Sequence, residues 1–210
     1  MGFKKGENPY HPRKGAAIKV DPIRDLGAIA QIKCNLEREG KYRDLCLFIL
    51  GINTGWRANE LLSIRVGDVE HLKDYDMLEL KQSKNKKYRM TPLNPAARQA
   101  VQAWLKIYRV EHFAHYAPNA PLFMSMKYRR HALCVSSVNA LIKKWSRKVG
   151  INGPIGSHSM RKTWGYHQRV TFGVALSLIC RAYGHSSERE TLSYIGILPD
   201  EIDDLYRNEL

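Results

Sequence analysis

Residues 158–194 read HSMRKTWGYHQRVTFGVALSLICRAYGHSSERETLSY. Four side chains in this stretch have functional groups suited to acting on phosphate esters: His158, Arg161, His185 and Tyr194. Attack on a phosphodiester builds negative charge on its equatorial oxygens, so the reaction needs fixed cations, an in-line nucleophile and an acid for the leaving oxygen. The pattern therefore indicates phosphodiester chemistry with Tyr194 as the nucleophile.

Spacing and residue type support this interpretation. His158 and Arg161 are three positions apart, which puts them on one face of a helix near its anion-attracting start. Further upstream, TGWRANE supplies a second guanidinium, Arg57, which taken alone reads as a helix-surface arginine paired with Glu60. A tyrosine has a pKa near 10, so nearby cations are needed to favour the phenolate of Tyr194.

Five motifs occur in one order along the chain: TGWRANELLSIRVGDV (54–69), KNKKYRMTPL (84–93), HSMRKTWG (158–165), YGHSS (183–187) and TLSY (191–194). Together they resemble the tyrosine recombinases, also called the phage integrase family. The resemblance implies a catalytic domain that is mainly α with a small antiparallel β-sheet. It also implies a site-specific recombinase that cleaves and rejoins double-stranded DNA through a covalent 3′-phosphotyrosine intermediate. No metal and no other cofactor is expected, because arginines supply the positive charge.

The resemblance also assigns roles to individual residues. Arg57 and Arg161 bind the phosphate and Glu60 orients Arg57, while His158 accepts the proton of Tyr194 or bonds the phosphate. His185 contacts a non-bridging oxygen. The family places its acid lysine eight residues before the proline of a V/T-P-L sequence, which here gives Lys84 as the group that protonates the leaving 5′-oxygen. The neighbouring cations are expected to contact DNA: Lys81, Lys86, Lys87 and Arg89.

Two positions depart from the family pattern. Tyr183 stands where the family usually has leucine, and we interpret it as a packing residue. Lys162 stands where many members have a second histidine. Neither departure removes one of the catalytic groups.

Charge points to a polyanionic partner. The formal net charge is +14, with basic clusters at 1–20, 81–89 and 127–148 and an acidic stretch at 199–210. Clustered basic charge of this size is typical of nucleic-acid binding, so we expect double-stranded DNA as the partner.

Composition and residue spacing exclude other classes of protein. No apolar run approaches the roughly 18 residues of a membrane span. The cysteines Cys34, Cys46, Cys134 and Cys180 are scattered, which indicates reduced thiols in a cytoplasmic protein. Within the cytoplasm, we expect the protein to be nucleoid-associated. His112 and His115 lack nearby partners for a metal site.

Periodicity predicts a flexible basic arm at 1–20 and one catalytic domain at 21–210. A helix is expected from Asp21-Pro22 to Gly40, followed by helices at 42–53 and 57–64. Strands at 76–81 and 87–92 should form a hairpin around the turn 83–86. Further helices are expected from Pro95 to about Tyr108 and at 135–149, 159–172 and 174–182, with a small amphipathic helix at 198–206.

Alternatives and assembly follow from the same residues. A type IB topoisomerase uses related chemistry, but such enzymes usually have lysine at the position of His158. A DNA-binding protein of the same fold without recombinase activity is the other alternative. Recombination requires four strand cuts, so we expect a monomer in solution and a homo-tetramer on synapsed DNA. Only about 40 residues precede the helix at 42–53, so the chain is either a short natural recombinase or a catalytic fragment.

Overall fold

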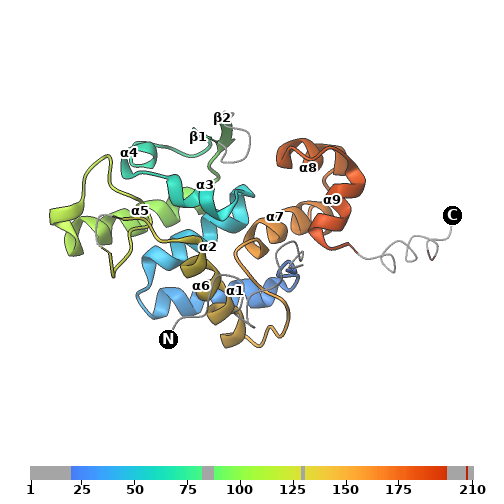
Figure 1. Ribbon diagram of the computed structural model, residues 1–210, viewed down its shortest axis with the longest axis horizontal. Helices are drawn as coiled ribbons and strands as arrows, with labels where there is room; N and C mark the ends of the chain where they lie inside the picture. Colours follow the sequence, from blue (N-terminus) through green and yellow to red (C-terminus); the bar gives the residue numbers. More distant parts are fainter. Residues whose placement is uncertain (1–19, 82–87, 129–130, 198–206, 208–210) are drawn as a thin grey trace, which may run out of the picture.

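The computed structural model describes residues 20–81, 88–128, 131–197 and 207. Within these ranges helices dominate and one antiparallel pair of strands is present (Figure 1). The elements are α1 (Leu26–Arg38), α2 (Tyr42–Thr54), α3 (Ala58–Ser63), α4 (Val66–Val69), β1 (Met77–Lys81), β2 (Tyr88–Pro92), α5 (Pro95–Glu111), the 3₁₀ turn η1 (Phe113–His115), α6 (Val135–Lys148), α7 (Ser159–Val170), α8 (Leu176–Tyr183) and α9 (Glu188–Ile195).

Helix α2 forms the centre of the larger core. Its sequence YRDLCLFILGINT is apolar around most of its circumference, as expected of a helix covered on several sides. It packs against α1, α5 and α7, and the Phe48 ring meets the edge of Trp145 on α6. The buried position of α2 fixes where its C-terminal loop, which carries candidate site residues, lies against α7.

Gly55 is required at that C-terminal end for two reasons. It ends α2 in the left-handed conformation, with φ +63°, which glycine adopts at little cost. A Cβ atom added there would also lie 2.6 Å from the Trp164 ring of α7. The glycine therefore allows the loop at 54–57 to approach α7 closely.

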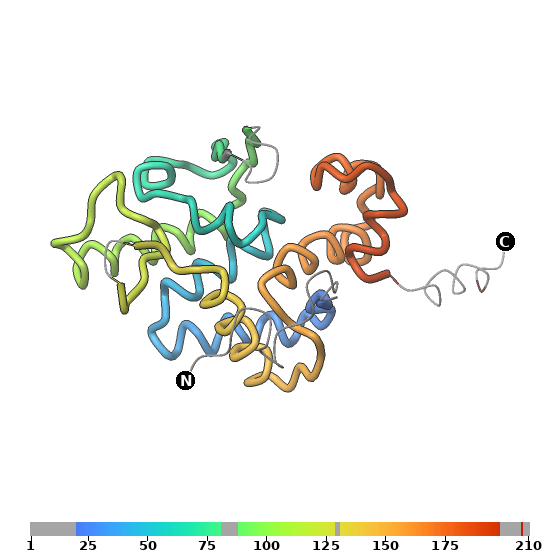
Figure 2. Tube along the Cα trace, in the orientation of Figure 1, coloured from blue at the N-terminus to red at the C-terminus, as the bar shows by residue number. Residues whose placement is uncertain are grey.

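A second, smaller core joins α7, α8 and α9. Figures 1 and 2 show α8 and α9 at one side of the molecule, with α7 between them and the larger body. Ile179, Tyr183 and Ile195 are its buried members, and Trp164 and Tyr194 pack against them. Tyr194, the candidate nucleophile, therefore belongs to this smaller core.

The strands β1 and β2 form the predicted hairpin. They pair antiparallel from Met77 opposite Pro92 to Lys81 opposite Tyr88. Because side chains alternate along a strand, Arg89 and Thr91 face the protein while the flanking residues are exposed. The Trp56 indole Nε1 donates to Thr91 Oγ1 at 3.0 Å, which ties the hairpin to the loop after α2.

The fold class predicted from the sequence is confirmed, and most predicted elements occur within a few residues of their expected bounds. The predicted helix start at Asp21-Pro22 is wrong. The Asp25 carboxylate caps α1 instead, accepting from the backbone N–H groups of Gly27 and Ala28. Ile23 stays outside the helix because its N–H donates to Thr163 Oγ1, and its carbonyl bonds the ring of His167 on α7. The predicted arm up to residue 19 and the predicted helix at 198–206 lie outside the described residues.

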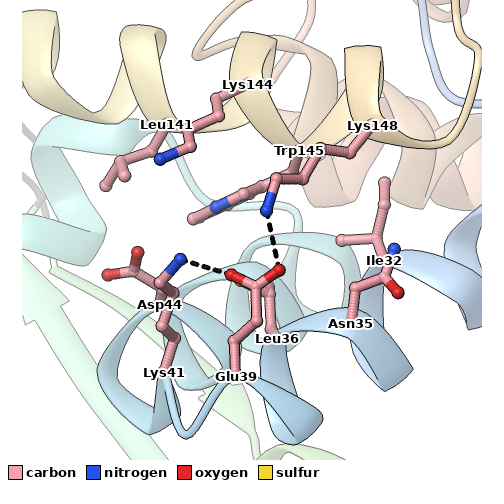
Figure 3. Close-up of a pocket in the computed structure, with 10 residues that line it drawn as sticks. All are labelled: Ile32, Asn35, Leu36, Glu39, Lys41, Asp44, Leu141, Lys144, Trp145 and Lys148. Atoms are coloured by element: carbon pink, nitrogen blue, oxygen red, sulfur yellow. Dashed lines mark hydrogen bonds and ion pairs between the residues drawn. The ribbon is translucent and has the colours of Figure 1, made fainter.

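A pocket between α1, α2 and α6 is separate from the candidate site. Ten residues line it, among them Ile32, Leu36 and Trp145 (Figure 3). Glu39 crosses its mouth, accepting from Lys148 Nζ at 2.7 Å and from Lys41. These hydrogen bonds with the two lysines lower the pKa of Glu39 to about 2. None of the candidate catalytic residues that the structure describes lines this pocket. In the described part of the chain, no helix is long and apolar enough to cross a membrane.

Candidate active site

Tyr194 and His158 meet across two helices. Ser187 caps α9 by accepting from the Glu190 N–H, and Tyr194 lies in the last turn of that helix. His158 is the residue at which α7 begins. The Tyr194 hydroxyl and His158 Nδ1 lie 3.3 Å apart, within reach of proton transfer once substrate aligns the pair. The sequence-predicted nucleophile and its proton acceptor are thus adjacent.

Arg161 is held deep in the same site. Its side chain is 1% exposed, and its guanidinium donates to the Gly55 carbonyl and, at 3.1 Å, to the Tyr183 carbonyl. The guanidinium carbon lies 4.3 Å from the centre of the Tyr183 ring and 5.9 Å from that of Tyr194. Arg161 therefore bridges the larger core to the smaller one and fixes a cation beside the nucleophile.

Arg57 is positioned by Glu60. The Glu60 side chain, 2% exposed, accepts from the Arg57 backbone N–H at 2.8 Å and from Arg57 Nη1 at 3.0 Å. A buried carboxylate that holds both groups leaves the guanidinium few alternative positions. The contact at i and i+3 is thus present, and the role of Glu60 in orienting Arg57 toward a phosphate stays a prediction.

His185 lies in the turn between α8 and α9, and its ring meets that of Tyr194 edge-on. Its ring centre lies 5.0 Å from that of Tyr194, and its Nδ1 lies 3.0 Å from Thr191 Oγ1. The Thr191 hydroxyl also donates to the Ser187 carbonyl at 3.2 Å, so this threonine connects His185 to the start of α9.

Nearby cations and partial burial shift the pKa values of Tyr194 and His158. Desolvation raises the pKa of Tyr194 above its usual value, and the charge of Arg161 opposes part of that shift. His158 has lost part of its hydration, and this desolvation lowers its pKa, with Arg161, Arg57 and Lys162 acting in the same direction. At neutral pH the tyrosine therefore keeps its proton while the histidine is unprotonated and able to accept it.

The structure leaves some predicted residues without a placed side chain. Lys84, Lys86 and Lys87 lie outside the described residues, and for Lys81 only the backbone, paired with Tyr88, is described. Arg89 is described: it is half-buried and bonds the Thr54 carbonyl. A residue that only contacted DNA at the surface would not need this burial.

Sequence reasoning missed part of the site. Lys162, interpreted only as a departure from the family, is 6% exposed and places Nζ 5.0 Å from the centre of the Tyr194 ring. Tyr183, interpreted as a packing residue, is packed as predicted, and it also donates to the Arg161 carbonyl at 2.6 Å. The adjacency of Lys162 to Arg161, and of Tyr183 to His185 two positions on, was the available signal.

The arrangement matches a known family. The sequence pattern of the phage integrase family matches residues 23–200. The chain belongs to the phage integrase family. Among the residues that the structure describes, no group of three or more His, Cys, Asp or Glu is placed to hold a metal ion.

Relatives of this phage integrase family member include short and long proteins. The probable integrase/recombinase YoeC of Bacillus subtilis is 32% identical over 90% of this chain and 96% of its own length. Tyrosine recombinase XerC of Chlamydia caviae is 28% identical over 76% of this chain, which spans about half (49%) of that protein. The structure of XerH recombinase bound to palindromic difH, a post-cleavage complex, aligns with TM-score 0.70 and 20% identity over 88% of this chain and 51% of that one.

Proposed function

We propose that this chain is a site-specific DNA recombinase that cleaves and rejoins strands through a covalent 3′-phosphotyrosine intermediate. The contact of the Tyr194 hydroxyl with His158, beside the fixed guanidinium of Arg161, is the observation that carries the proposal. Names of relatives agree, since they include an integrase/recombinase and tyrosine recombinases.

The proposed reaction is a balanced exchange of esters. The Tyr194 oxygen attacks the scissile phosphorus while His158 accepts the phenol proton, and the phosphorus–5′-oxygen bond breaks. Arg57, Arg161 and His185 stabilise the charge on the non-bridging oxygens, and Lys84 protonates the leaving 5′-oxygen. A 5′-hydroxyl from a partner strand then attacks the phosphotyrosine and releases Tyr194. No bond energy is lost to water, so rejoining needs no nucleotide.

Double-stranded DNA is the proposed partner, with Lys81, Lys86, Lys87 and Arg89 contributing contacts. The proposed working assembly is a homo-tetramer on two synapsed duplexes, formed from monomers in the cytoplasm. The XerH structure is a complex with DNA, and the net charge of +14 on this chain favours the same kind of partner.

Covalent capture tests the proposed function. The binding site is first selected from random duplexes with the Tyr194→Phe variant, which is expected to bind without cleaving. In a duplex of that site with a nick just downstream of the scissile phosphate, cleavage releases the short fragment that carries the 5′-hydroxyl. Rejoining is then prevented, and the covalent intermediate is trapped. We expect a band that resists denaturation and carries the labelled strand that ends at the scissile 3′-phosphate. Binding without any such band would leave a DNA-binding protein of the same fold.

Lys84 is expected to act as the general acid. Lys84→Ala should cleave ordinary DNA about 10²–10⁴-fold more slowly, because no proton is delivered to the leaving oxygen. A substrate with sulfur at the leaving 5′ position needs no proton, so Lys84→Ala should cleave it at the unsubstituted protein's rate. Lys86→Ala serves as the matched control: it keeps Lys84, so any loss of rate from a weakened DNA contact should be the same on both substrates. Rescue of Lys81, Lys86 or Lys87 variants instead would move the role to that lysine.

Cleavage is expected to depend on pH through His158. The pKa of this histidine lies below its usual 6.5, so its neutral, proton-accepting form is lost only when the pH falls below that value. The adduct rate is measured at concentrations well below saturation, where its pH profile reports the pKa values of the protein without DNA. This rate should rise with a midpoint below pH 6.5 and stay level from about pH 7 to 9. The folded state disfavours the charged ring, so stability should also decrease as the pH falls through 6.5.

The matched variants separate the titration of His158 from other effects of low pH. In His158→Ala the rate should be lower at pH 7 and continue to rise toward the high pKa of Tyr194. A change at the exposed His71, outside the site, should leave the profile unaltered. A profile of His158→Ala that still levels off below pH 7 would contradict the assignment.

A further inference from the structure

Arg89 lies on the inward face of β2 and reaches the loop that carries the site. Its Nη2 donates to the Thr54 carbonyl at 3.3 Å, one residue before the Gly55 carbonyl that Arg161 holds. Arg57 follows two residues later in the same loop. Two guanidiniums from other elements, Arg89 on β2 and Arg161 on α7, therefore bond the loop at 54–57, which itself carries Arg57.

The second amino group of Arg89 is buried without a use. Nη1 has almost no solvent contact and no hydrogen-bond partner among the residues that the structure describes. An unpaired buried donor on a charged group carries a large desolvation cost. An unpaired donor among other cations is well suited to bind an anionic ligand such as a phosphate.

The neighbouring positive charges add to the cost of burying the Arg89 guanidinium. Burial lowers the pKa of Arg89 to about 10, and the charges of Arg161 and Arg57 act in the same direction. Glu60 opposes them, but its carboxylate is already bonded to Arg57 through both oxygens. The cluster thus carries more positive charge than its carboxylate neutralises, which a bound phosphate would correct.

We propose that Arg89 is a further catalytic residue whose Nη1 donates to a non-bridging oxygen of the scissile phosphate, together with Arg57 and Arg161. This inference rests on the proposed function and goes beyond a general contact with the DNA backbone. The alternation of β2 supports it, because Arg89 shares the inward face with Thr91 while Tyr88 and Met90 are exposed.

A substrate with a neutral scissile group tests this placement. Replacing one non-bridging oxygen of the scissile phosphate by methyl removes the negative charge that a cation would stabilise. Arg89→Ala should form adduct about 10²–10³-fold more slowly than the unsubstituted protein on ordinary DNA. On the methylphosphonate substrate the two proteins should differ by no more than about threefold, because the transition state no longer carries the charge that Arg89 stabilises.

Controls identify what each outcome means. Arg57→Ala should behave like Arg89→Ala, and Arg98→Ala, which changes an arginine paired with Asp74 on the surface, should be normal on both substrates. A loss of the same size on both substrates, or a rescue only when the neighbouring phosphate is neutralised, would overturn the proposal. If circular dichroism shows that Arg89→Ala is unfolded, Arg89→Lys takes its place with the same two expectations and a smaller loss.

The failure of this inference is distinct from failure of the proposed function. Normal cleavage of ordinary DNA by Arg89→Ala would refute the role of Arg89 and leave the recombinase proposal intact. An unsubstituted protein that forms no adduct on the selected site would overturn both. In the absence of DNA, the melting temperature of Arg89→Ala should stay within a few degrees or rise, because a repelled cation has been removed. A large fall in melting temperature, together with an equal loss of adduct on both substrates, would identify Arg89 as a structural residue only.

Discussion

Tyr194→Phe should form no covalent adduct while binding DNA with unchanged affinity. The substitution removes one oxygen and keeps the ring, which packs against Tyr183 at 5.3 Å and His185 at 5.0 Å between ring centres. Affinity should stay within about threefold, since it arises mainly from phosphate contacts spread over the duplex. The measurement is adduct formation on the nicked duplex beside a binding titration at the same salt concentration.

The neighbouring tyrosine provides the matched control for this prediction. Tyr183→Phe removes the same atom from a ring of the same cluster. The Tyr183 hydroxyl, however, already donates to the Arg161 carbonyl and has no proposed contact with substrate. Tyr183→Phe should retain adduct formation. An adduct formed equally well by Tyr194→Phe would refute the choice of nucleophile, and its loss in Tyr183→Phe alone would transfer that role to Tyr183.

Arg161→Ala should abolish most activity and weaken the fold as well. Removing one preorganised cation from a developing anion costs about 10²–10³-fold in rate. The same change leaves the Gly55 and Tyr183 carbonyls without their donor, at roughly 2–3 kcal/mol of unfolding free energy. Adduct rates are measured at a temperature where urea titration shows that the variant is folded.

Arg161→Lys separates the two effects of this residue. Lysine keeps a charge but has one amino group, which cannot reach both carbonyls in the geometry of a guanidinium. Its rate and stability should fall between those of the unsubstituted protein and Arg161→Ala. Cleavage by Arg161→Ala at the normal rate would exclude Arg161 from the phosphate site, whatever its effect on stability.

Much of this structure was predictable because the signals are local. The apolar run of α2, the Asn94-Pro95 start of α5 and the pairing of the neighbouring strands β1 and β2 each depend on residues near in sequence. The start of α1 was not predictable in this way. Asp21-Pro22 has the local chemistry of a helix cap, but contacts of Ile23 with Thr163 and His167, about 140 residues away, keep that segment out of the helix.

The candidate site divides along the same line. Tyr194, His158 and Arg161 follow from motifs whose order resembles a known family, and the structure brings them together. The burial of Arg89 and the position of Lys162 over the Tyr194 ring depend on how β2 and α7 pack. No periodicity in the sequence reports that packing, so the sequence predicted only a DNA contact for Arg89 and showed Lys162 only as a departure from the family pattern.

The most direct measurement identifies the residue that carries the DNA. The trapped adduct is digested with nuclease and trypsin, and the modified peptide is fragmented in a mass spectrometer. The account predicts a nucleotide joined through its 3′-phosphate to Tyr194, within the tryptic peptide of residues 190–207. Modification at Tyr206 of the same peptide, at Tyr183 in the peptide of residues 182–189, or through a 5′-phosphate would contradict it.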